Sequence, residues 1–178
     1  MEGKWRPGEK LEALRLADDF GVSMTPVRDC LNRLVGEGLV EMKPGDGYRV
    51  PRISEKILRD MLDLNAMLLE FALAQPSNAG PMPKSEYLVT DYAGRISIVF
   101  EVIASRSANV VLAELLHSLG DRLHAIRQWE PHLFSDWAQE LTKIERQLTG
   151  DPKALNDSLR QYHDRRRDKI AELVQLSL

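Results

Sequence analysis

The chain has 178 residues and a formal net charge of −3, with 43% hydrophobic and 29% charged residues. This length suits two small domains, and the composition is typical of globular proteins. No apolar run approaches a membrane span and no signal peptide precedes the first expected helix, so membrane and secreted proteins are not expected. The single cysteine, Cys30, cannot form an intramolecular disulfide, which is typical of a reducing cytoplasm.

The segment from Pro7 to Val50 predicts two short helices, a tight turn and a small β-hairpin. In the first helix, residues at helical spacing predict one apolar face. They are Leu11, Leu14, Ala17 and Phe20. Gly21 is expected to end this helix, because glycine tolerates the left-handed conformation found at helix C-termini.

Ser23 is a candidate N-cap for the second helix, and Pro26 falls in its first turn, where a missing N–H costs little. Apolar spacing predicts a buried stripe in this helix. Its members are Val27, Cys30, Leu31, Leu34 and Val35. Because Cys30 falls on this stripe, we expect a small core residue there rather than a reactive thiol.

The opposite side of the second helix is polar and is expected to face solvent. It carries Met24, Thr25, Arg28, Asp29 and Asn32. Leu39–Lys43 and Tyr48–Val50 then predict short strands around the turn formed by residues 44–47. This order of elements is that of a winged helix-turn-helix, in which the N-terminal end of the second helix enters the major groove of DNA.

These residues resemble a known family. The sequences PGEKL, LADDFGVS, TPVRDCLNRL, EGLVE and GYRV lie where the GntR family of bacterial transcription regulators carries its signature. The resemblance covers about the first fifty residues. It implies a DNA-binding domain over residues 1–52, with the rest of the chain forming a second domain.

Two departures from the family pattern affect this prediction. The family usually has arginine where this chain has Met24, which offers only apolar contact, for example with a thymine methyl group. The family also has a further helix before PGEKL, whereas the sequence given begins about where that helix would end. If that helix is absent, Trp5 or a partner subunit would cover part of the apolar stripe at Val27, Leu31 and Leu34.

The predicted DNA-binding residues lie at the start of the second helix, further along it, and in the wing. They are Ser23, Met24, Thr25, Arg28, Arg33, Lys43, Gly45 and Arg49. Residues 1–52 hold nine basic and nine acidic side chains, so placement rather than net charge would provide affinity. We expect moderate, salt-sensitive binding that is raised by dimerisation.

Residues 53–178 predict an all-helical bundle, so the whole chain is expected to be mainly α. Ser54 is expected to cap a helix over residues 55–74, with Ile57, Met61, Leu64, Leu68 and Phe71 as its apolar pattern. Residues 75–83 break regular structure. Further helices are expected over residues 85–106, 110–128 and 135–148, and from Pro152 to near the C-terminus.

This second part is similar to the FCD-type helical effector domains of one GntR branch. The resemblance is carried by MLDLNAMLLEFALA, IASRSANVVLAELL, LTGDPKAL and the final helix. Many such domains bind a divalent metal through one Asp and three His. The corresponding positions here are Ile96, Phe100, Glu140 and Tyr162, with His163 one residue further on.

Two of these four positions are apolar, so the resemblance predicts no metal cofactor in this chain, and Glu140 and His163 would be the best surviving ligands. The same five residues are instead expected to line a cavity that is either closed or suited to an apolar or aromatic ligand. His117 and His124 are about 10 Å apart along a helix, too far to chelate one ion. The run 165–167, three arginines between Asp164 and Asp168, is expected to form a solvated helix face.

No enzyme signature appears in the sequence: there is no phosphate-binding glycine-rich loop, nucleophile elbow or His-Glu-x-x-His pattern. The sequence therefore predicts a cytoplasmic homodimeric regulator, most simply a repressor, whose partners are a palindromic double-stranded DNA operator and a candidate small-molecule effector. Three alternatives stay open at this point. They are a helical ligand-binding or interaction protein with a degenerate DNA reader, a metal-dependent enzyme on the bundle, which the lost ligands disfavour, and a bundle that dimerises without sensing anything.

Overall fold

The computed structural model describes residues 5–75 and 91–178, and it divides into two compact units. The first extends to Ile53 and the second covers Ser54–Ser177. The division lies one residue beyond the boundary expected from the sequence. Each unit is described by itself.

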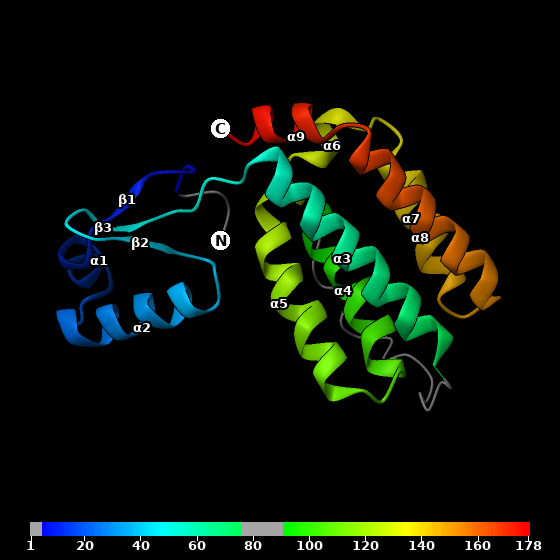
Figure 1. The fold of residues 1–178 in the computed structure, drawn as a ribbon, viewed down its shortest axis with the longest axis horizontal. Coiled ribbons are helices and arrows are strands. Elements are labelled where there is room, and N and C mark those ends of the chain that lie inside the picture. The colour runs from blue at the N-terminus through cyan, green and yellow to red at the C-terminus, as the bar shows by residue number, and fades with distance from the viewer. Residues whose placement is uncertain (1–4, 76–90) are drawn as a thin grey trace. The chain divides into compact units, whose positions relative to one another are not determined.

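The first unit joins two helices to a small antiparallel sheet (Figure 1). Its elements are β1 (Lys10–Leu11), α1 (Ala13–Phe20), α2 (Met24–Gly36), β2 (Glu41–Lys43) and β3 (Gly47–Arg49). The strand order is β1-β3-β2, with Leu11 and Met42 both opposite Tyr48. The helix-turn-helix and the β2–β3 wing agree with the prediction, whereas the β1 strand was not expected.

Gly21 ends α1 in the left-handed conformation, with φ at 65°, as the sequence indicates. The prediction for the apolar face of α1 was wrong at Leu14 and Phe20, which are each 62% exposed. The reason is that Leu11 belongs to β1 rather than to the helix. The face of α1 that packs in the core is therefore the one carrying Leu16 and Ala17.

On α2, Val27 and Leu31 are buried as predicted, and Leu34 and Val35 pack against them from half-buried positions. The prediction of a buried Cys30 was wrong, because its side chain is exposed in the described unit. The buried face of α2, which packs against α1 and the sheet, is therefore narrower than the apolar sequence pattern predicted.

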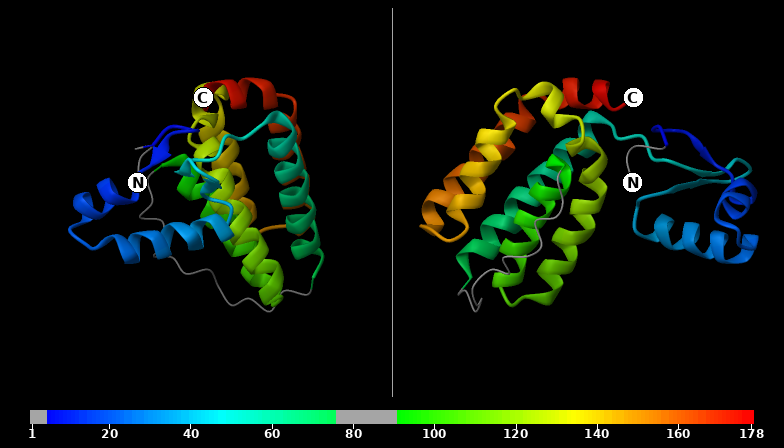
Figure 2. Two further views of the ribbon diagram at one scale, coloured as in Figure 1. Left: turned by 60° about the vertical axis from the view of Figure 1, so that its left-hand side comes forward. Right: turned by 180° about the vertical axis from the view of Figure 1, so that it is seen from behind.

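The second unit consists of seven described helices. They are α3 (Glu55–Ala74), α4 (Tyr92–Arg106), α5 (Val110–Arg127), α6 (Glu130–Leu133), α7 (Trp137–Gln147), α8 (Pro152–Arg167) and α9 (Ile170–Leu176). Helix α3 contacts α4, α5 and α8, while α7 packs on α8 and α4. The short helices α6 and α9 lie together at one end of this bundle (Figure 2).

Helix starts follow the predicted capping chemistry. Ser54 accepts a hydrogen bond from Ile57 N, and Asp151 accepts from the first turn of α8, in which Pro152 is the first residue. The expected last helix is instead interrupted after Arg167, and α6 replaces an expected connector. The predicted break at 75–83 and the predicted helical residues 85–90 lie almost entirely outside the described residues.

The apolar pattern predicted for α3 was only partly correct. Met61 is buried and Leu68 is half-buried, but Ile57, Leu64 and Phe71 are exposed. Another set of residues fills the buried face: Leu58, Leu62, Asn65, Leu69 and Ala72. Helix α3 therefore carries apolar side chains on two faces, of which one lies in the core.

No helix within the described ranges has both the length and the apolar character needed to cross a lipid bilayer.

Candidate nucleic-acid interface and effector site

The N-terminal end of α2 presents an exposed polar edge. Ser23 lies at the N-cap position with extended backbone, but its hydroxyl makes no capping hydrogen bond. Met24, Thr25 and Arg28 follow it on exposed positions. Backbone N–H groups at a helix start and the positive end of its dipole attract phosphate oxygens. The Ser23 hydroxyl and the first backbone N–H groups of α2 can therefore bind phosphate oxygens without first losing a capping hydrogen bond.

Arg28 and Arg33 differ in how freely they could contact DNA. Arg33 pairs with Glu37 one turn further on, at 3.6 Å, and both side chains are exposed. None of the ion pairs found among residues 5–75 and 91–178 involves Arg28, which is also exposed. Arg28 is thus the cation on α2 whose guanidinium is most available to a phosphate or a guanine.

The three predicted wing residues have different environments. Gly45 lies at the exposed tip with φ at 78°, a conformation that favours glycine. Lys43 is exposed and its Nζ lies 3.9 Å from Glu41. Arg49 is half-buried, with Nε 2.5 Å from Asp46 Oδ2 and Nη1 donating to Gly8 O at 2.9 Å.

Arg49 therefore stabilises the wing itself. Its hydrogen bond also lowers the pKa of the Asp46 carboxyl below its ordinary value. A guanidinium held in this way is less available for the DNA backbone than the exposed amine of Lys43. This role of Arg49 could not be predicted from sequence, because it depends on Arg49 lying beside Gly8 in the folded unit.

A contact that sequence reasoning missed joins the wing to α2. The Tyr48 hydroxyl on β3 donates to Asn32 Oδ1 at 2.7 Å. Asn32 was expected on the solvent side of α2, and it is exposed. The hydrogen bond sets the orientation of its amide and ties the wing to the helix, so the two elements would approach a duplex together.

The second unit brings most of the predicted effector-site residues together in its core. Ile96 and Phe100 on α4 are buried, as are Tyr162 and His163 on α8. The Phe100 ring lies 5.6 Å from the Tyr162 ring and 6.0 Å from the His163 ring, measured between centroids. Glu140 on α7 is half-buried and pairs with arginines rather than with these rings.

The two best surviving metal ligands are both occupied. Glu140 Oε1 accepts from Arg165 and Arg166 at 2.9 Å each. His163 Nδ1 lies 2.7 Å from Leu159 O and its Nε2 lies 2.9 Å from the Asn65 amide. A metal would have to displace these partners, and Ile96 and Phe100 supply no ligand atoms. Within the described ranges, no three His, Cys, Asp or Glu side chains lie close enough to hold an ion. The residues present do not fit the family's metal.

His163 is a neutral imidazole in this core. Burial lowers its pKa to about 3, and nearby arginines act in the same direction. A neutral ring that donates from Nδ1 to Leu159 O must accept at Nε2. The Asn65 amide is placed with Oδ1 toward Nε2, and its buried Nδ2 has no hydrogen-bond partner. Turning this amide by 180° lets Nδ2 donate to His163.

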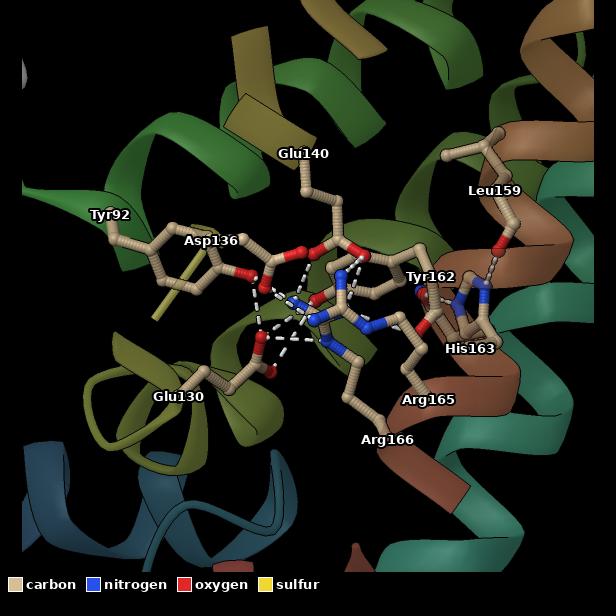
Figure 3. Close-up of polar contacts among 10 residues, drawn as sticks. Tyr92, Glu130, Asp136, Glu140, Leu159, Tyr162, His163, Arg165 and Arg166 are labelled. Carbon is tan, nitrogen blue, oxygen red and sulfur yellow. Dashed lines mark hydrogen bonds and ion pairs between the residues drawn. The ribbon is translucent and has the colours of Figure 1, made fainter. Parts of the chain in front are cut away.

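A buried ion cluster lies beside these rings (Figure 3). Arg166 is 0% exposed, and its Nε donates to Glu130 Oε2 at 2.9 Å. Tyr92 donates to the same carboxylate and accepts from Arg166 Nη2 at 2.8 Å. Glu140 lies on the other side of the guanidinium, with Oε2 2.7 Å from Nη2.

The prediction of a solvated 165–167 face was therefore wrong at its central residue. Arg165 and Arg167 are both half-buried, and they pair with the exposed Asp136 and Asp63, respectively, at 2.5 Å each. Burial alone would lower the pKa of Arg166, but Glu130 raises it well above its ordinary value, so it stays charged. Burial and Glu130 also raise the pKa of the Tyr92 hydroxyl, which stays protonated.

Comparison with known proteins agrees with the architecture of both units. The structure resembles that of McbR/YncC from E. coli, with a TM-score of 0.65 over 98% of this chain and 91% of that chain, at 20% identity. A putative GntR regulator from Rhodococcus gives a TM-score of 0.75 over 96% and 90%, at 15% identity. At such identities the likeness establishes the fold, a winged helix-turn-helix followed by a helical domain.

Residues 1–50 match the family model for bacterial regulatory proteins of the gntR family. The chain is 35% identical over 79 residues to the HTH-type transcriptional repressor GlaR of Escherichia coli, covering 42% of this chain and 36% of GlaR. It is also 35% identical over 69 residues to the Nta operon transcriptional regulator of Aminobacter aminovorans, covering 39% and 33%. The matched stretches thus span about a third of each relative. The N-terminal unit of the chain is therefore similar to the DNA-binding domain of GntR-family helix-turn-helix regulators.

Proposed function

We propose that this protein is a sequence-specific DNA-binding transcription regulator that acts in the cytoplasm as a homodimer on a two-fold symmetric operator. Repression is the simplest outcome, and it is supported by the description of GlaR as a repressor. In this proposal the helical unit is an FCD-type domain that provides the dimer contact and senses a small molecule.

The observation that carries the proposal is the exposed edge of α2. Ser23, Thr25 and Arg28 offer hydroxyl and guanidinium donors next to the N-terminal end of a helix whose other face is fixed in the core. In a helix-turn-helix this end contacts base edges and phosphates. Met24 lies between these residues and would add apolar contact.

Dimerisation is supported by apolar side chains that the bundle leaves exposed. On α3 these are Ile57, Leu64, Met67 and Phe71, and on the neighbouring α5 they are Val110, Val111 and Leu115. Exposed apolar residues concentrated on adjacent helices mark association surfaces more often than scattered ones do. A second copy of the same face would cover them in an isologous contact.

The proposed sensing role rests on the buried group around Phe100. Ile96 and Phe100 replace the family's Asp and first His with apolar surface, so any effector would bind without a metal. Tyr162, His163 and Glu140 would be the nearest polar groups, although each already has a hydrogen-bond or ion-pair partner. A bundle that only dimerises is the alternative.

Selection from random double-stranded DNA, followed by fluorescence-anisotropy titration of the enriched duplex, tests the proposal. The expected result is an enriched site with two-fold symmetry that binds more tightly than a scrambled duplex. Binding without any sequence preference would favour the alternative of a helical interaction protein with a degenerate reader.

A further inference from the structure

Asn32 is an exposed amide on α2 that was not among the DNA-binding residues predicted from the sequence. With about 3.6 residues per turn, it lies on the same helix face as Thr25, Arg28 and Asp29, one turn beyond Arg28. All four side chains are exposed. In a helix-turn-helix, the exposed face of the second helix lies against the base edges of the major groove. Asn32 is therefore placed to contact a base.

The Tyr48 hydroxyl holds the Asn32 amide in one orientation. Tyr48 lies on β3, the central strand of the sheet, and its ring packs against the hydrophobic core of the first unit. Its hydroxyl donates to Asn32 Oδ1 at 2.7 Å. Because the core holds the ring in place, this bond fixes which end of the exposed amide carries the oxygen.

The amide of Asn32 keeps hydrogen-bonding capacity on both of its polar atoms. Oδ1 has a second lone pair, and Nδ2 has two hydrogens that no described residue accepts. Asn32 thus offers one acceptor beside one donor. In the major groove, adenine offers the N6 donor beside the N7 acceptor, whereas guanine offers two acceptors, N7 and O6. The polar pattern of Asn32 therefore matches adenine and not guanine.

The carboxylate of Asp29 favours a base rather than a phosphate as the partner of Asn32. Residues three apart on a helix lie side by side, so the exposed Asp29 is a neighbour of Asn32. None of the ion pairs within residues 5–75 and 91–178 neutralises Asp29. A phosphate bound to Asn32 would meet this negative charge, whereas an uncharged base edge would not.

We propose that Asn32 recognises an adenine of the operator through paired hydrogen bonds to N6 and N7, and that Tyr48 is the residue that positions it. This inference rests on the proposed function and adds a specificity-determining pair to it. An exposed asparagine loses side-chain freedom when it binds, and a hydrogen bond that orders it beforehand reduces this cost. Tyr48 thus contributes to the choice of base without contacting DNA.

Selection from random double-stranded DNA, carried out in parallel with the full wild-type chain, Asn32→Ala and Asn32→Asp, tests the contact. The wild type should select adenine at one position of each half-site. Both variants should lose this choice and keep the other selected bases, because alanine has no polar side-chain atom and an aspartate cannot donate to N7. Aspartate has the shape of asparagine, so it tests the contact even if Asn32→Ala is unfolded.

Fluorescence anisotropy then measures the preference on two duplexes that differ only at this position. For the wild type, exchange of the A·T pair for G·C should weaken binding between about 5-fold and about 150-fold, the range for one good bidentate contact. Asn32→Ala should bind the two duplexes nearly equally. Cys30→Ala changes an exposed residue on another face of α2 and should keep the wild-type preference.

Tyr48→Phe removes the hydroxyl but keeps the ring that packs in the core. It should lower the preference for adenine over guanine by about two- to tenfold, because Asn32 is then ordered only when it binds. A purely structural role of Tyr48 would instead weaken binding to both duplexes by the same factor.

An unchanged choice of base in both Asn32 variants would overturn the inference even where the wild type binds a specific operator. Equal weakening on the two duplexes would also overturn it, since Asn32 would then contact the DNA backbone. A wild-type chain that enriches no sequence would contradict the proposed function itself, and this inference with it.

Discussion

Arg28 is the residue for which exposure, position and the lack of an ion pair within the described ranges all agree with a role in DNA binding. It lies one turn from the start of α2, and its side chain takes no part in the described core. Arg49, predicted from sequence as a DNA-binding residue of the wing, is instead hydrogen-bonded to Asp46 and Gly8. The two arginines should therefore respond differently to substitution.

Arg28→Ala should weaken operator binding by about 1–3 kcal/mol while leaving the unfolding midpoint unchanged, because the side chain is exposed. Fluorescence anisotropy on the selected duplex and urea unfolding followed by circular dichroism measure the two quantities. Arg15→Ala, an exposed arginine on α1, is the matched control and should have little effect. Unchanged affinity for the Arg28 variant would remove this residue from the interface.

Met24→Arg should act in the opposite direction. It restores the family's usual cation at an exposed position beside Thr25, so binding should tighten across sequences rather than for one operator alone. The slope of log affinity against log salt should steepen by about one, as expected for one added phosphate contact. Titrations between low and moderate salt measure this slope. A tighter complex with the original slope would argue against a phosphate contact.

The buried pair Arg166–Glu130 should be far more sensitive than the exposed pair Arg160–Glu70. Glu130→Gln leaves a buried guanidinium with half of its charge compensation and should destabilise the fold by about 3–5 kcal/mol. Glu70→Gln should cost less than about 1 kcal/mol. Chemical unfolding compares the two variants. Similar losses of unfolding free energy for the two variants would mean that the buried Arg166–Glu130 pair stabilises the fold no more than an exposed ion pair does.

Among the elements, the sequence predicted helix ends more accurately than buried helix faces. The ends of α1, α5 and α7 lie within a few residues of the predicted ones, and the Ser54 and Asp151 caps are present. The predicted buried faces of α1 and α3 were only partly correct, and α3 carries apolar residues on two faces, so its periodicity does not show which face is buried. The two-residue strand β1 was missed because its pairing with β3 depends on residues about forty positions apart.

The central arginine of the 165–167 run shows the same limit at the candidate site. Three consecutive arginines look alike in sequence, yet the fold buries one of them. A signal was present: Leu155, Leu159 and Tyr162 form a helical stripe that continues into Arg166. The partners that make this burial tolerable, Glu130 and Tyr92, come from α6 and α4 and could not be inferred from local pattern.

Phe71 on α3 tests the proposed association surface. Phe71→Glu places a charge among the exposed apolar residues and should convert a dimer into a monomer, as measured by light scattering after size-exclusion chromatography. Lys56→Glu reverses an exposed charge near the start of the same helix and should leave the assembly unchanged. If the Phe71 variant keeps the mass of the wild type, the dimer contact lies elsewhere.

In the proposed function, the whole molecule combines a DNA-binding unit with a helical unit that dimerises and binds a small-molecule effector. A two-fold dimer would present two copies of α2 to successive major grooves, so each half-site needs only moderate affinity. Such a requirement is compatible with a winged unit whose basic and acidic residues balance over positions 1–52. An effector bound in the helical unit would act by changing the distance between the two DNA-binding units of the dimer.

The most direct test of the central claim is the affinity of the full chain for a duplex selected from random DNA, compared with a scrambled duplex of equal length. The two-fold symmetric site should bind at least about a hundredfold more tightly at moderate salt, and Arg28→Ala should reduce that preference. Equal affinity for the two duplexes, with no enriched sequence after selection, would contradict the assignment of this protein as a sequence-specific regulator.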